Sequence, residues 1–149
     1  MTDTDGTEYE VLLIGGRSAG GRTSVGYEVS DRLQAAGIAH CLVGGGGNLD
    51  AAYPKAVDDP NGTTLTATNL TALWRNYSAI GHRRLIYVNT ACVLEHKMIV
   101  RSMGGGARAT YLDSAAESWI ARIATDRRAV ADVAADVVEA TAWTSSPAR

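Results

Sequence analysis

The residues best suited to chemistry form a glycine-rich loop near the start of the chain. The stretch 16–23 reads GRSAGGRT, with the apolar run VLLI before it and apolar residues at helical spacing after it. A G-x-x-x-x-G-K-[ST] loop between a strand and a helix directs backbone N–H groups at a phosphate. The predicted phosphate-binding residues are Gly16, Arg17, Ser18, Gly20, Gly21, Arg22, Thr23 and Ser24. The competing interpretation is a strand-to-helix turn that binds nothing.

One fixed position of this loop departs from the pattern. Arg22 stands where the motif has lysine. Lysine brings a compact charge to the β- and γ-phosphates, whereas arginine is a planar fork. The loop can therefore still hold an anion, but we expect phosphoryl transfer to suffer. If the loop is active, Thr23 or Ser24 supplies the hydroxyl for Mg²⁺.

Phosphoryl transfer also needs an acidic residue at the end of a neighbouring strand. The run LIYV ends at Asn89, and the run CLV ends in Gly44–Gly47, so neither strand supplies one. Asp50 is the nearest acidic residue and the best candidate base. A turn-capping aspartate is the alternative. No metal site is predicted, because the three histidines share no ligand spacing.

The elements that position these residues alternate along the chain. Alternating strands and helices predict an α/β fold with a parallel sheet, helices on both faces and right-handed crossovers. Ligands in such sheets bind beyond the carboxyl ends of the strands, so 15–23, 44–50, 89–92 and 125–127 should share one rim. The expected strands are 9–15, 38–43, 84–89, 109–112 and 119–124, and the expected helices are 25–37, 66–80, 92–103 and 130–138.

Composition limits the class of protein. The 149 residues are 46% hydrophobic and 20% charged, which suits one domain over 1–149, with flexible tails at 1–8 and 144–149. The net charge of -2 argues against nucleic acid as a partner. No run is long enough to span a membrane, and the acidic start is no signal peptide, so a cytoplasmic location is expected. Cys41 and Cys92 cannot form a disulfide framework or a zinc site alone.

Five stretches carry a resemblance to a known group. VLLIGGRSAGGRTSVGYEVS, NLDAAYP, LWRNY, GHRRLIYVNT and TDRRAVADVAADVVEATAW resemble the small P-loop kinases, especially small actinobacterial kinase-like ATPases. The resemblance covers most of the chain and implies a three-layer, kinase-like P-loop NTPase fold. It implies an acceptor site near Arg75, where the guanidinium could bind an anionic group. The alternative is that Arg75 is a solvent-exposed arginine of a helix. The remaining candidate substrate-binding residues are Asn48, Tyr53 and Asn89.

The departures from that group concern one site. The group has lysine in place of Arg22, an acidic pair in place of Gly44–Gly47, and a lid segment that is missing here between Tyr111 and Trp119. Three joint changes favour a degenerate kinase scaffold that binds or transforms a small molecule without ATP, with specialised metabolism as one setting. Under this hypothesis Asp50, Arg75 and Arg22 act on the ligand through their fixed charges.

Two other hypotheses remain open. One is an ATP-dependent small-molecule kinase that uses Arg22, Thr23 and Asp50, with ATP or GTP and Mg²⁺ as cofactors if the loop is active. The other is a non-catalytic subunit or regulator, whose exposed cleft could serve a homodimer.

Overall fold

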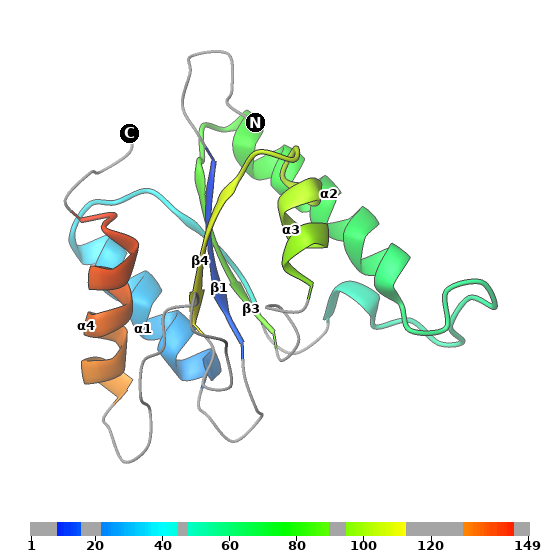
Figure 1. The fold of residues 1–149 in the computed structure, drawn as a ribbon, viewed down its shortest axis with the longest axis horizontal. Coiled ribbons are helices and arrows are strands. Elements are labelled where there is room, and N and C mark those ends of the chain that lie inside the picture. Colours follow the sequence, from blue (N-terminus) through cyan, green and yellow to red (C-terminus); the bar gives the residue numbers. More distant parts are fainter. Residues whose placement is uncertain (1–8, 16–21, 45–47, 90–94, 113–129, 145–149) are drawn as a thin grey trace.

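The protein is described here from a computed structural model, which covers residues 9–15, 22–44, 48–89, 95–112 and 130–144. Strands and helices alternate as the sequence predicts (Figure 1). The predicted strand 119–124 and the lid region after Leu112 lie outside the described residues. The elements are β1 (Glu10–Ile14), α1 (Arg22–Ala35), β2 (Cys41–Val43), η2 (Asn48–Asp50), α2 (Thr63–Ala79), β3 (Arg84–Val88), α3 (His96–Ser102), β4 (Arg108–Leu112) and α4 (Val130–Thr141).

The four described strands form one sheet in the order β2-β3-β1-β4. Every pairing is parallel, and Leu12 of β1 lies beside Ile86 of β3 and Thr110 of β4. This confirms the predicted parallel sheet. Because all strands run the same way, their carboxyl ends lie at one edge.

Helices cover both faces of the sheet, which gives three layers (Figure 1). Side chains alternate along β1, so Leu12 and Ile14 pack into a core with α1 and α4, whereas Val11 and Leu13 pack into a second core with α2 and α3. Gly26 lets α1 approach β3 closely, because a Cβ there would lie 2.7 Å from Val88 Cγ2.

Helix α2 begins three residues before the predicted start, at Thr63. The apolar spacing begins later, but polar groups already fix the first turn. The Asp59 carboxylate accepts hydrogen bonds from the backbone N–H groups of Thr64 (3.1 Å) and Leu65 (3.0 Å). These bonds lower the pKa of Asp59, because they favour its charged form.

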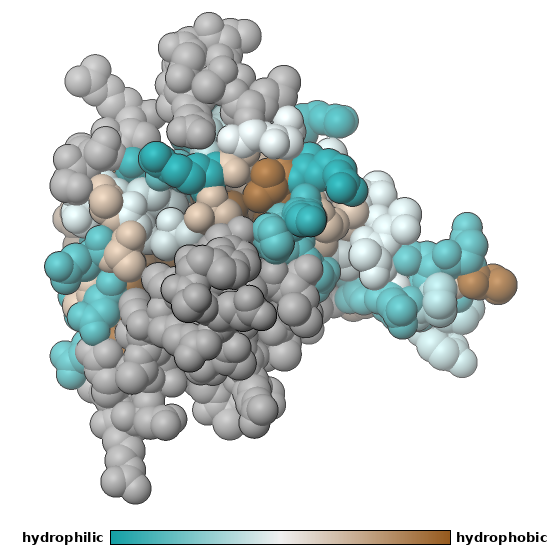
Figure 2. All heavy atoms as spheres, in the orientation of Figure 1, coloured by the Kyte–Doolittle hydropathy of each residue, from teal (hydrophilic) through white to brown (hydrophobic). Residues whose placement is uncertain are grey.

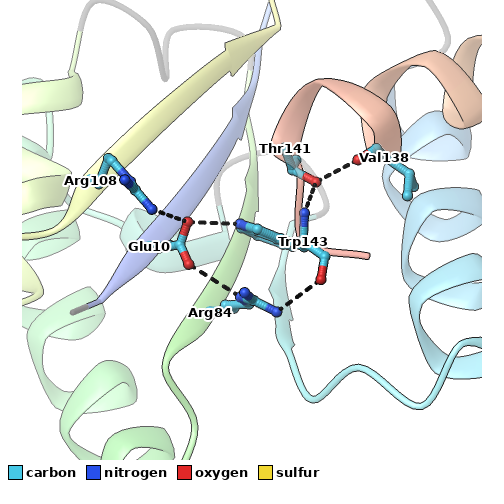
Figure 3. Close-up of polar contacts among 6 residues, drawn as sticks. All are labelled: Glu10, Arg84, Arg108, Val138, Thr141 and Trp143. Atoms are coloured by element: carbon cyan, nitrogen blue, oxygen red, sulfur yellow. Dashed lines mark hydrogen bonds and ion pairs between the residues drawn. The ribbon is translucent and has the colours of Figure 1, made fainter. Parts of the chain in front are cut away.

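A polar cluster lies at the amino ends of the strands (Figure 3). The Glu10 carboxylate meets Arg84 Nε at 3.3 Å, a guanidinium nitrogen of Arg108 at 3.2 Å and Trp143 Nε1 at 3.1 Å. Arg84 is only 3% exposed, and its guanidinium also lies 5.3 Å from the centre of the Trp143 ring. Trp143 follows α4, so this cluster attaches the end of the described chain to β1, β3 and β4.

The sequence also led to expectations about the two cysteines and about membrane-spanning segments. Cys41 is buried on β2, which raises the pKa of its thiol to about 12 and keeps it protonated at neutral pH. Cys92 lies outside the described residues. Within the described part of the chain, no helix is long and apolar enough to cross a membrane.

Candidate functional site

A cavity of about 250 Å³ opens at the carboxyl ends of β2 and β3. Parallel α/β sheets place ligands at this edge. The cavity is bounded by the ends of two strands, by η2, by the first turn of α2 and by the start of α3. Its described lining residues are Val43, Gly44, Leu49, Asp50, Asn61, Thr63, Thr66, Tyr87, Val88, Asn89 and Glu95.

The short helix η2 carries Asp50 to this cavity. This segment lies outside the strands and helices expected from the sequence, but 48–50 form one turn of 3-10 helix. Asn69 of α2 fixes this turn, because its Nδ2 donates a 2.6 Å hydrogen bond to the carbonyl oxygen of Leu49. Lys55 Nζ donates to the backbone oxygen of Asp50 and lies 3.2 Å from Asp50 Oδ2. The carboxylate is thus held from its outer side.

Gly62 packs directly against that carboxylate. A Cβ at this position would lie 2.5 Å from Asp50 Oδ2, and the backbone has φ +71°, which glycine adopts without strain. Gly62 also starts α2, since its carbonyl oxygen accepts the Thr66 N–H at 2.9 Å. One residue therefore sets both the start of α2 and the place of Asp50.

Glu95 is a functional candidate that sequence analysis missed. It precedes α3 and lines the cavity together with Asp50. Burial raises the pKa of the Glu95 carboxyl, and the negative charge of Asp50 raises it further. The available signal was position: Glu95 follows β3 on the same rim as Asn89. Gly44 and Asn89 follow β2 and β3, whereas the acidic side chain comes from the residue directly before the next helix.

Two predicted residues therefore meet at this cavity, namely Asp50 and Asn89. The Asn89 backbone N–H donates to the carbonyl oxygen of Ile14 at 3.1 Å, which ties the end of β3 to the end of β1. The phosphate-binding loop was predicted directly after β1. The end of β1, which precedes that predicted loop, thus lies at the same edge of the sheet as the cavity.

Arg75 and Tyr53 are not brought to this cavity. Arg75 follows Thr66 by nine residues on α2, roughly 13 Å along the axis at about 1.5 Å per residue. It is exposed, and it borders shallow depressions at the far end of the helix. Tyr53 is 98% exposed. It belongs to the segment 51–61, which extends away from the body of the protein (Figures 1 and 2).

The other predicted site residues are described only in part. The backbones of Arg22, Thr23 and Ser24 form the first turn of α1, and that of Asn48 begins η2. Residues 16–21, with Gly16, Arg17, Ser18, Gly20 and Gly21, lie outside the described residues, as do Gly45–Gly47.

Comparison with known proteins bears on the fold. No family model and no curated protein sequence matches this chain. Solved structures do match it. An APS kinase, CysC, from Mycobacterium tuberculosis, solved with AMPPNP and APS, has 17% identity and a TM-score of 0.57 over 90% of this chain and 98% of its own. A gluconokinase from Sinorhizobium meliloti has 14% identity and a TM-score of 0.53 over 89% and 91% of the two chains. The chain therefore has the three-layer fold of the P-loop kinases.

Proposed function

We propose that this protein binds a small polar molecule in the cavity beside η2, and that ATP-dependent phosphoryl transfer is not its activity. The observation that carries the first half is the placement of Asp50 and Glu95 on one cavity at the ligand-binding edge of the sheet. Two carboxylates in such a cavity can accept hydrogen bonds from a ligand and hold it in one orientation.

The size of the cavity limits the ligand. Ligand pockets commonly measure roughly 300–1,000 Å³, and this one measures about 250 Å³. The described lining also offers the side chains of Asn61, Thr63 and Asn89 as hydrogen-bonding groups. A small metabolite with several polar groups suits this lining better than a large apolar molecule does.

The sequence departs from the kinases it resembles at three places that serve ATP-dependent transfer. Arg22 replaces the lysine that reaches the transferred phosphate, and Gly44–Gly47 replace the expected acidic pair. The lid segment that would exclude water also has no counterpart between Tyr111 and Trp119. Under this proposal, the protein has the cleft of a kinase fold and uses it for another ligand or reaction.

An ATP-dependent small-molecule kinase is the second candidate, and Glu95 favours it. In that reaction Asp50 or Glu95 accepts the proton of a ligand hydroxyl. The hydroxyl oxygen then bonds to the γ-phosphorus of ATP, and ADP leaves. The fold neighbours include one kinase solved with AMPPNP and APS, which supports a nucleotide as a cofactor for this candidate.

Calorimetric titration with ATP and with GTP, each with and without Mg²⁺, separates the two candidates. The first predicts no binding at millimolar nucleotide, while small polar ligands still bind at the cavity. Micromolar, Mg²⁺-dependent nucleotide binding that supports phosphorylation of any small acceptor would overturn it. An Arg22→Lys variant serves as the matched control, because a gain of nucleotide affinity in that variant alone shows what the arginine removed.

A further inference from the structure

We infer that the ligand of this cavity carries a positively charged organic group, a protonated amine or a guanidinium, that lies between Asp50 and Glu95. This inference rests on the proposed small-molecule site and names the class of ligand. It draws on three features of the described residues: the charges that line the cavity, an unused hydroxyl group within it, and the cost of placing two carboxylates together.

The charge of the described lining is of one sign. Asp50 and Glu95 supply two carboxylates, and none of the described lining residues is a lysine, arginine or histidine. Lys55 contacts Asp50 Oδ2 at 3.2 Å, but it belongs to the exposed segment beyond η2 and does not line the cavity. An anionic group at this place would meet two like charges, whereas a cationic group would be paired with both.

Thr66 places a further hydrogen-bonding group in the cavity. Its side chain lines the cavity, and the residue is only 7% exposed. Its backbone N–H bonds to the Gly62 carbonyl oxygen, whereas its hydroxyl has no hydrogen-bond partner among the described residues. This oxygen is not one of the buried, unpaired polar atoms of the described residues, so it is open to the cavity. A polar ligand there can form a hydrogen bond with it.

The two carboxylates also repel each other. Glu95 is half-buried beside the charge of Asp50, and both effects raise the pKa of its carboxyl group. A cation between the two side chains would offset both effects. The described residues contain no group of three or more His, Cys, Asp or Glu side chains that could hold a metal ion. Two carboxylates with several waters can also hold Mg²⁺, so the response to Mg²⁺ alone is one arm of the test.

Protein-observed NMR with a charge-balanced fragment library tests the inference. Equal numbers of cationic, neutral and anionic fragments are added to the full chain, with glucosamine, glucose and gluconate as one matched set. Backbone signals of Thr66 and Glu95 report binding. The same titrations are run on Glu95→Gln, and on Glu139→Gln as a control, because Glu139 is an exposed residue of α4.

The expected result is that the fragments that bind at the cavity are mainly cationic. We expect Glu95→Gln to weaken their binding about tenfold and Glu139→Gln to leave it unchanged. Cavity ligands that are equally often neutral or anionic would overturn the charge assignment and leave the small-molecule site standing. The charge assignment would also be overturned if Mg²⁺ alone moved the cavity signals and Glu95→Gln weakened that response. If no fragment moves the cavity signals, the proposed function itself fails, and the charge assignment fails with it.

Discussion

At the scale of single residues, Glu95 distinguishes this cavity from the site that the sequence suggests. Four glycines follow β2 where the resembled kinases carry acidic residues, so the sequence offers Asp50 as the nearest carboxylate. The fold nevertheless brings Glu95 from the start of α3 to the same cavity as Asp50. The two carboxylates of this cavity therefore come from η2 and from the residue before α3.

Glu95→Gln should make the folded protein slightly more stable at neutral pH. The folded-state pKa of Glu95 is raised, so its charged form destabilises the fold above that pKa, and the penalty disappears as pH falls below the unfolded value. We expect a melting temperature higher by on the order of 1–2 °C at pH 7, with the difference vanishing near pH 4. Scanning calorimetry from pH 4 to 8 measures this. A variant that is less stable than the wild type at pH 7 would contradict it.

At the scale of elements, the join between η2 and α2 controls the cavity. Asn69 holds the turn of η2, and Gly62 begins α2 against the side chain of Asp50. The Asp59 carboxylate caps the first turn of the same helix. Since Thr63 and Thr66 of this turn also line the cavity, the capping of α2 and the shape of the site depend on the same few residues.

Gly62→Ala should damage both the fold and the site. The new Cβ would meet Asp50 Oδ2, and φ +71° strains any residue with a side chain, for a combined cost of roughly 1–3 kcal/mol. Gly37→Ala is the matched control, because Gly37 has φ +73° with open space around its Cβ position. Urea unfolding should show a larger loss for Gly62→Ala, and only that variant should shift the NMR signal of Glu95. Equal losses of unfolding free energy in the two variants would mean that the contact with Asp50 does not contribute to stability.

At the scale of the whole molecule, the proposed site and the polar cluster around Glu10 lie at opposite edges of the sheet. The cavity is at the carboxyl ends of the strands. The cluster of Glu10, Arg84, Arg108 and Trp143 is at their amino ends (Figure 3). This cluster joins three strands to the end of α4, so it secures the fold without contributing to the cavity.

Glu10→Ala should therefore destabilise the protein strongly and leave ligand preference unchanged. Arg84 is 3% exposed and would lose a carboxylate partner, which costs about 3 kcal/mol when a buried ion pair is broken. Glu28→Ala is the control, because its ion pair with Arg32 on α1 is partly exposed and should contribute less than about 0.5 kcal/mol. Urea unfolding compares the Glu10→Ala and Glu28→Ala variants. Similar, small losses of unfolding free energy would show that the cluster does not stabilise the fold.

The class of fold follows from local patterns in the amino-acid sequence. The apolar runs at 11–14 and 85–88 are buried strands, and the spacing of Leu70 and Trp74 is that of a helix face packed on a core. These features are local, because they depend on periodicity and on breaks at glycine and proline. They were enough to predict a parallel sheet covered on both faces, and the alternation of strands and helices gave its topology class.

The set of side chains that share the cavity depends on how the elements pack together. Asp50, Thr66 and Glu95 come from three separate elements, and nothing in their spacing along the chain marks them as neighbours. Arg75 was predicted beside the same site, but the rise of α2 carries it past the cavity to the far end of the helix. Periodicity fixes the face of a helix on which a residue lies. The distance between that residue and a ligand depends on where the helix begins. Here Gly62 and Asp59 set the start of α2.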